Sequence, residues 1–245
     1  MRAMVLAAGL GTRLRPLTDD RPKALVEVAG RSLLEITLAR LRAFGIREVI
    51  VNVHHFADQV VSFLRAHDNF GMRLEISPED VLLDTGGGLK NVAHFFPSQD
   101  EPFLVHNVDV ISTIDLGKLV QAHAEKGGLA TLAVQDRKTS RYLLFDPSGR
   151  LCGRRAGTDG RPEMARAAST FNAFAFAGIH VISPRLLKLM TEEGSFPIVP
   201  CYLRLVAAGE NIFAFRADQY YWRDLGKPEN LMQAAEDVEH GLLKI

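Results

Sequence analysis

Hydrophobic and polar positions follow two different periods along the first half of the chain. Short apolar runs at residues 4–8, 49–53, 74–77 and 102–109 are typical of strands. Between them, residues 32–44 and 57–67 repeat apolar side chains every three to four positions, as amphipathic helices do, and residues 86–96 begin with a third helix. Strands alternating with helices predict an α/β fold, with a mainly parallel sheet covered by helices on both faces.

The second half of the chain has a different pattern. Residues 130–134, 142–145, 150–153, 173–182 and 212–215 are predicted strands separated by turns or short helices, which favours a small antiparallel extension of the sheet. Residues 153–169 are rich in Gly, Arg and Ala without periodicity, and we expect a mobile loop beside a cleft. Because no linker separates two cores, we expect one domain, 1–245, with subregions 1–128 and 129–245.

Composition removes several function classes. The chain has 29 Lys plus Arg and 29 Asp plus Glu, so no global basic field is available for binding nucleic acid. Cys152 and Cys201 lie far apart in the sequence, with no disulfide or zinc pattern, which fits a reducing cytoplasm. No apolar run approaches the about 20 residues that span a membrane. We therefore expect a cytoplasmic protein without nucleic-acid or membrane partners; its oligomeric state stays open.

Glycines and cations follow the first predicted strand. Gly9 and Gly11 allow the backbone to pass close to a ligand, and Arg13 and Lys23 add positive charge suited to phosphate oxygens. Leu14 stands where a dinucleotide fingerprint needs its third glycine, and no Gly-Lys-Ser/Thr follows as in a Walker loop. A nucleoside triphosphate is the expected ligand, and a dinucleotide-dependent oxidoreductase is disfavoured.

The run L-A-A-G-L-G-T-R-L-R-P-L-T from Leu6 to Thr18, followed by Pro22-Lys23, resembles the signature of the sugar-phosphate nucleotidyltransferases. This resemblance implies a Rossmann-like fold and an Mg²⁺-dependent reaction in which an NTP and a sugar 1-phosphate give an NDP-sugar and pyrophosphate. It also implies small-molecule substrates, with a sugar kinase as a possible pathway partner. Asp109 and Asp224 match the family's two metal-binding aspartates, although Val108 and Lys227 depart from its pattern. A strand-end or turn carboxylate is the alternative interpretation of either aspartate.

The resemblance also assigns roles to individual residues. Arg13 is expected at the β- and γ-phosphates and Lys23 at the α-phosphate, so that Arg13, Lys23 and Asp109 form the catalytic group. Backbone groups of the first loop and the segments near residues 79 and 85 are expected to bind the nucleotide, with the glycine N–H groups donating to a uracil or thymine. The predicted nucleotide-binding residues are Ala7, Ala8, Gly9, Gly11, Thr12, Arg13, Lys23, Glu79, Thr85, Gly86 and Gly87.

The acceptor side is less defined. Asn172, Gly178 and Asp224 are expected to bind the sugar phosphate, and Arg154 or Arg155 can replace a lysine that contacts it in relatives, although a solvated loop is an equal alternative. His54 and His55 point to opposite sides of a strand and cannot readily share one metal ion, and their roles stay open, as does that of Lys227.

The segment from Leu83 to Gly88 is similar to the short uridylyltransferases that act on N-acetylmuramic acid 1-phosphate in cell-wall recycling. UTP with that acceptor is therefore the expected substrate pair. GTP with mannose 1-phosphate, CTP with a phosphocholine-type acceptor, and a catalytically silent nucleotide-sugar sensor remain as alternatives. Retention of both aspartates together with Arg13 and Lys23 disfavours the sensor.

Overall fold

A computed structural model describes residues 1–96 and 101–245. Its central sheet begins as predicted, with parallel strands. β1 (Arg2–Leu6) lies between β4 (Glu48–Val53) and β6 (Phe103–Asn107), and β5 (Arg73–Pro78) adds to β4 in the same direction. The carboxyl ends of these strands meet at one edge, which is where ligands bind in open α/β sheets.

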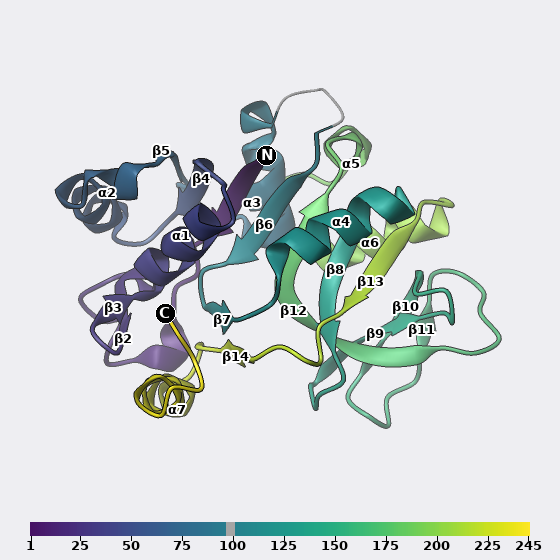
Figure 1. Cartoon of the computed structure of the whole chain (residues 1–245). Coiled ribbons are helices and arrows are strands. Elements are labelled where there is room, and N and C mark those ends of the chain that lie inside the picture. The colour runs from purple at the N-terminus through teal and green to yellow at the C-terminus, as the bar shows by residue number, and fades with distance from the viewer. Residues whose placement is uncertain (97–100) are drawn as a thin grey trace.

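The sheet continues through strands of opposite direction. The long β12 (Asn172–Ile182) pairs antiparallel with β6, and then with β8 (Ala130–Gln135) and β9 (Arg141–Phe145). From β9 an antiparallel ribbon extends through β10 (Leu151–Ala156) to β11 (Glu163–Met164), and β13 (Ile212–Arg216) pairs with β8. Figure 1 shows this ribbon as an extension at one end of the molecule. The mixed sheet and its antiparallel extension confirm the predicted fold class.

Helices cover both faces of the sheet, and each face has its own apolar core. One core contains side chains from α1 (Leu33–Ala43), α2 (Ala57–Ala66), α4 (Leu116–Lys126) and α7 (Pro228–Glu239). The other contains side chains from α3 (Asp84–Asn91), α5 (Arg185–Leu189) and α6 (Ile198–Ala207). In Figure 1, α1 and α4 lie in front of the sheet. Within the described ranges, no helix has the length and apolar character needed to cross a membrane.

Local sequence signals explain several helix boundaries. Ser32 begins α1 as predicted, because its side chain accepts a hydrogen bond of 3.1 Å from the Glu35 amide. Asp115 caps α4 in the same way through the Lys118 amide, at 2.9 Å. The part of the chain that the structure describes also contains 3-10 helices at Thr12–Leu14, Lys23–Leu25, Asp68–Gly71 and Ala93–Phe95. Two small sheets pair β2 (Glu27–Val28) with β3 (Arg31–Ser32), and β7 (Val110–Ser112) with β14 (Trp222–Asp224).

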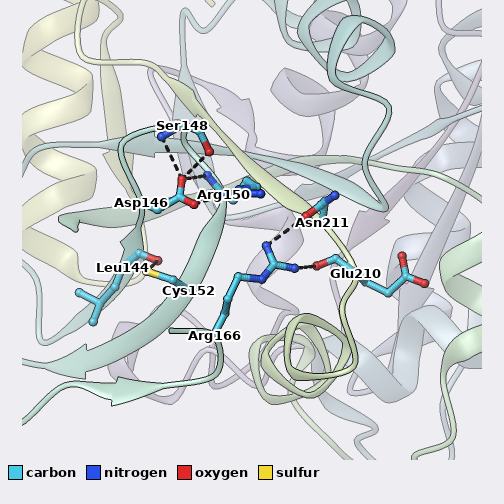
Figure 2. Close-up of polar contacts among 8 residues, drawn as sticks. All are labelled: Leu144, Asp146, Ser148, Arg150, Cys152, Arg166, Glu210 and Asn211. Carbon is cyan, nitrogen blue, oxygen red and sulfur yellow. Dashed lines mark hydrogen bonds and ion pairs between the residues drawn. The ribbon is translucent and has the colours of Figure 1, made fainter. Parts of the chain in front are cut away.

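The expectation of an irregular loop at residues 153–169 is wrong in part. β10 continues to Ala156, and β11 pairs with it through Gly153 and Arg154. The segment is fixed at its end by Arg166, whose guanidinium donates to the Asn211 side chain at 3.0 Å and to the Glu210 carbonyl at 2.6 Å (Figure 2). The start of β10 was predicted at residues 150–153, but its continuation to Ala156 and the short β11 were missed, because pairing with neighbouring strands stabilises them and no local pattern reveals it.

Candidate active site

Two aspartates far apart in the sequence meet at the carboxyl edge of the sheet. Asp109 lies in the turn between β6 and β7, and Asp224 ends β14. The antiparallel pairing of β7 with β14 sets Asp224 opposite Val110, and the Leu225 amide donates to the Asp109 carbonyl at 2.7 Å. Both side chains line the same cavity. The structure thus brings together the two predicted metal ligands.

Lys23 lies at the same point, although it belongs to the first loop. The 3-10 helix Lys23–Leu25 follows Pro22 and directs the Lys23 ammonium onto a carboxylate oxygen of Asp109, with which it forms an ion pair. Lys23 is only 8% exposed, so the pair is largely shielded from water. A shielded ion pair interacts more strongly than a surface one, and its charge is held in a fixed place.

Gly226 allows a close approach between Arg13 and Asp224. A Cβ built on Gly226 would lie 2.7 Å from an Nη atom of Arg13 and 2.7 Å from a carboxylate oxygen of Asp224. That same oxygen accepts a hydrogen bond of 2.6 Å from the Gly226 amide, which fixes the carboxylate. Arg13, Lys23, Asp109 and Asp224 therefore form one charged cluster, which we call the catalytic cluster.

The first loop is shaped by Gly11, which has a φ of 66°. A side chain there would lie 2.9 Å from a methyl group of Thr18, whose hydroxyl donates to the Gly11 carbonyl at 2.9 Å. Thr12 is exposed in the 3-10 helix that follows. Gly9 has no atom within 4 Å of the position of a Cβ, so the backbone there faces open space. This arrangement leaves room for a ligand beside Gly9.

A buried chain of hydrogen bonds joins the first loop to the segment near residue 79. The Asn52 side chain accepts from the Ala7 amide at 2.8 Å and donates to a carboxylate oxygen of Glu79 at 2.7 Å. The other Glu79 oxygen accepts from the Leu83 amide at 2.9 Å. Ala7, Ala8 and Glu79 are buried, and the amide of Ala7 is already engaged. Asn52, which the sequence did not single out, thus positions both predicted nucleotide segments.

The glycines at 86–88 were expected to donate their N–H groups to the base of the nucleotide, and for Gly86 and Gly87 the structure shows another use of these groups. The amides of Gly86 and Gly87 donate to the Phe196 carbonyl at 2.9 and 3.1 Å, so they do not point at a free ligand site. Side chains at 86, 87 or 88 would collide with Phe196, with the Gly194 carbonyl, and with Glu79. Gly86 and Gly87 therefore permit close packing between α3 and the segment before α6, and Gly88 permits close packing of α3 on Glu79 and Asn52. Contact of Gly86 and Gly87 with a nucleotide stays a prediction, while Thr85 does line the cavity.

The main cavity has a volume of about 660 Å³ and runs from the catalytic cluster to the β9–β11 ribbon. A smaller cavity of about 470 Å³ shares Arg13, Arg137 and Asp224 with it and also contains Lys227. Between them, the Arg137 guanidinium lies 3.6 Å from the centre of the Trp222 ring, and it donates to the Phe176 carbonyl at 2.9 Å. Burial lowers the pKa of Arg137, and nearby Asp224 opposes that shift.

Comparisons with known proteins agree with this geometry. A family model for nucleotidyl transferases matches residues 2–241. The chain belongs to the nucleotidyl transferase family. This nucleotidyltransferase is 36% identical over 237 residues to the N-acetylmuramate alpha-1-phosphate uridylyltransferase of Caulobacter vibrioides, covering 95% of this chain and 94% of that one. It is 30% identical to the UTP--glucose-1-phosphate uridylyltransferase of Synechocystis sp., covering 97% of this chain and 63% of the relative.

A solved structure supports the fold of the nucleotidyltransferase. A putative glucose-1-phosphate thymidylyltransferase from Bacillus anthracis superposes with a TM-score of 0.80, covering 96% of this chain and 94% of that one, at 18% identity. Together with the family match, these relatives make the chain an enzyme of the sugar-1-phosphate nucleotidyltransferase class.

Of the residues expected to bind the acceptor, Gly178 lies at the main cavity of this enzyme and Asn172 does not. Gly178 lines the main cavity with a φ of 72°, and a side chain there would lie 2.9 Å from the Asn107 amide nitrogen. Asn172 begins β12 opposite Phe145 and lines neither cavity, so the structure does not support its expected substrate contact. The two residues are six positions apart, which in a strand separates them by about 20 Å.

The arginines at 154 and 155 are adjacent but differ in their partners. Arg154 forms two hydrogen bonds with the Glu163 carboxylate, at 2.6 and 3.1 Å. Arg155 has its guanidinium 5.5 Å from the centre of the Tyr142 ring, and its buried Nε has no hydrogen-bond partner among the described residues. Both line the main cavity.

The histidines have structural contacts. His54 bonds through Nδ1 to the Glu79 carbonyl at 2.7 Å, and His55 packs against Phe56. His180 lines the cavity and bonds through Nδ1 to the buried Tyr202 hydroxyl at 2.6 Å. Burial lowers the pKa of His180 to about 3, so the ring is neutral at physiological pH.

Proposed function

We propose that this enzyme transfers a uridylyl group from UTP to N-acetylmuramic acid 1-phosphate, with Mg²⁺ as its cofactor. The observation that carries the proposal is the convergence of Asp109 and Asp224 beside Lys23 and Arg13. The choice of substrates rests on the relative from Caulobacter vibrioides, because the match covers nearly the full length of both chains.

The residues present fit a magnesium ion. Mg²⁺ is usually held by one or two carboxylates, with phosphate oxygens and water completing its shell. Asp109 and Asp224 would supply those carboxylates. No group of three or more His, Cys, Asp or Glu that could hold a metal ion gathers anywhere in residues 1–96 and 101–245, so the rest of the ion's shell would come from phosphate oxygens and water. When bound, the ion would neutralise phosphate charge and orient the triphosphate.

In the reaction, an oxygen of the acceptor phosphate attacks the α-phosphorus of UTP. The new bond joins that oxygen to the α-phosphorus, while the bond to the bridging oxygen breaks and its electron pair leaves with pyrophosphate. The attacking phosphate is already an anion near neutral pH, so no strong base is needed. Lys23, as a point charge, would stabilise the α-phosphate, and Arg13 would hold the departing phosphates through its forked donors. Arg137, beside Asp224, would face the acceptor phosphate.

The test is a matrix of nucleotides and acceptors. Purified enzyme with Mg²⁺ is given UTP, GTP, CTP or dTTP together with N-acetylmuramic acid, N-acetylglucosamine, glucose or mannose 1-phosphate, and pyrophosphate release is measured. The proposal predicts the highest kcat/KM for UTP with N-acetylmuramic acid 1-phosphate, and loss of activity on adding a chelator. Preference for GTP with mannose 1-phosphate would refute the substrate choice, since relatives with that activity are 27 to 30% identical.

Nucleotide binding without any pyrophosphate would instead favour the catalytically silent sensor. The cytoplasmic location and the kinase that would supply the acceptor stay predictions.

A further inference from the structure

Arginines dominate the part of the main cavity that lies away from the catalytic cluster. Six of them line the cavity as a whole: Arg13, Arg137, Arg141, Arg154, Arg155 and Arg161. The carboxylates that line it are already engaged or belong to the catalytic cluster. Asp109 pairs with Lys23, Glu163 pairs with Arg154, and Asp84 accepts from the Thr85 amide. The region around the β9–β11 ribbon therefore has an excess of positive charge.

Among residues 1–96 and 101–245, two arginines that line the cavity have a buried Nε without a hydrogen-bond partner: Arg137, beside the catalytic cluster, and Arg155, on the β9–β11 ribbon. Arg155 is the one that lies away from the catalytic cluster. Its Nε is buried and has no partner, and within the described ranges no carboxylate forms an ion pair with it. A buried guanidinium donor without an acceptor costs free energy, so a folded protein that keeps one calls for an explanation. The Tyr142 ring below the guanidinium supplies only a cation–π contact, at 5.5 Å from the ring centre.

The position of Arg155 is fixed before any ligand arrives. Arg155 pairs with Tyr142 across β10 and β9, and the turn between these strands is closed by Asp146, which accepts from the Ser148 and Arg150 amides at 2.9 and 3.0 Å. Figure 2 shows this turn beside Arg166, whose amide donates to the Cys152 carbonyl and whose guanidinium donates to Asn211, so the ribbon is held at the turn end as well as by its strand pairing. A preorganised cation loses little entropy when it binds an anion.

Arg155 lies too far from the catalytic cluster to bind the 1-phosphate of the acceptor while that phosphate attacks UTP. That phosphate has to reach the α-phosphorus near Asp109 and Asp224, where Gly178 of β12 also lies. β10 is two strands away from β12, or about 10 Å across the sheet. A sugar ring fits into such a gap, which leaves Arg155 facing a substituent on the far side of the ring.

We propose that Arg155 binds a second anionic group of the acceptor, a carboxylate carried by the sugar in addition to its 1-phosphate. This inference rests on the proposed function and adds a residue that selects the acceptor. Guanidinium and carboxylate form paired, parallel hydrogen bonds, which give direction as well as charge. The lactyl ether of muramic acid is such a carboxylate. Arg154 cannot take this role without losing Glu163, so it provides a matched control on the same strand.

The experiment compares two acceptors that differ only in the lactyl ether, N-acetylmuramic acid 1-phosphate and N-acetylglucosamine 1-phosphate, with UTP and Mg²⁺. The ratio of their kcat/KM values is measured for the wild type, Arg155→Gln, Arg155→Lys and Arg154→Gln. Arg155→Gln is expected to lower the ratio by about 10- to 100-fold, the usual effect of losing a hydrogen bond between charged groups. Arg155→Lys should lower it less, and Arg154→Gln should leave the ratio unchanged.

Equal losses with both acceptors would overturn the inference, because Arg155 would then contact a part that they share. A wild-type enzyme that uses N-acetylglucosamine 1-phosphate as well as the acidic acceptor would also overturn it, while uridylyl transfer itself would stand. Thermal unfolding checks each variant, and Arg155→Lys carries the test if the glutamine variant does not fold. If no pair releases pyrophosphate, the proposed function fails, and calorimetric binding of the two acceptors to wild type and Arg155→Gln decides the inference alone.

Discussion

The substitution Gly226→Ala probes whether Arg13 and Asp224 must lie close together. The new methyl group would lie 2.7 Å from an Nη atom of Arg13 and 2.7 Å from a carboxylate oxygen of Asp224. To restore an ordinary contact, each group has to move away by about 0.7 Å. The backbone at Gly226 does not have a positive φ, so the alanine itself introduces no conformational strain.

A displacement of this size at a phosphoryl-transfer site is expected to lower kcat/KM by about 10- to 100-fold. That corresponds to about 1.4 to 2.7 kcal/mol of transition-state stabilisation. Stability should fall little, because the crowded atoms are the ends of side chains that line the cavity, and because replacing glycine by alanine restricts the unfolded chain. The assay is continuous pyrophosphate release, with thermal unfolding measured in parallel.

Gly117→Ala is the matched control. Gly117 lies in α4, lines neither cavity, and has only an Asp115 carboxylate oxygen, at 3.2 Å, near the position of a Cβ. We expect wild-type kinetics from it. A wild-type kcat/KM in Gly226→Ala, or the same loss in both alanine variants, would show that catalysis does not depend on the close approach of Arg13 and Asp224.

Three further predictions follow from single contacts. Lys23→Ala should lower kcat by about 100-fold or more while changing the KM for the acceptor much less, because a fixed charge near the transferred phosphate is lost; an unchanged kcat would make Lys23 peripheral. Asn52→Ala should lower the free energy of unfolding by about 2–4 kcal/mol, since the Ala7 amide and the Glu79 carboxylate both lose a buried partner; urea unfolding measures this, and a loss below the error of the assay would contradict it. Burial lowers the pKa of His180 to about 3 in the folded enzyme, against 6.5 in the unfolded chain. The unfolded chain therefore binds a proton at His180 first, so the free energy of unfolding is highest above pH 6.5 and falls as the pH decreases toward 3. Between pH 7 and pH 5 the wild type should therefore lose about 2 kcal/mol more than His180→Gln, and equal losses in the two proteins would show that His180 does not titrate in this way.

The fold was largely predictable because its signals are local. The buried strands and the Ser32 cap follow from side-chain periodicity and from one hydroxyl group, and the structure confirms them. The second half of β10 and the whole of β11 were missed because their order comes from the pairing of Gly153 and Arg154 across the ribbon, not from an apolar pattern. Because β10 ends with Arg154, Arg155 and Ala156, its local composition resembles that of a solvated loop.

The parts of the site that belong to a family motif could be predicted from the sequence. Asp109, Asp224 and Lys23 were identified through a resemblance, and the structure brings them together. Arg137 was missed because it lies just after β8 with no motif around it, and its stacking on Trp222 depends on tertiary structure. The Gly86–Gly88 run had two physical explanations, ligand approach and helix packing. Only the positions of Phe196 and Gly194 distinguish them.

We propose that Asp109 and Asp224 act together on one substrate phosphate. The most direct measurement is the turnover of Asp109→Asn and Asp224→Asn, each of which removes a charge with almost no change in volume. Pyrophosphate release is measured with saturating UTP, Mg²⁺ and acceptor, and Asp58→Asn on the exposed surface of α2 serves as the control. Each active-site variant is predicted to lose about 100-fold or more in kcat while it still unfolds cooperatively above the assay temperature, and the control keeps full activity. Asp109→Asn should unfold at a lower temperature than Asp224→Asn, because Lys23 loses its partner. Wild-type turnover in both variants would contradict the account.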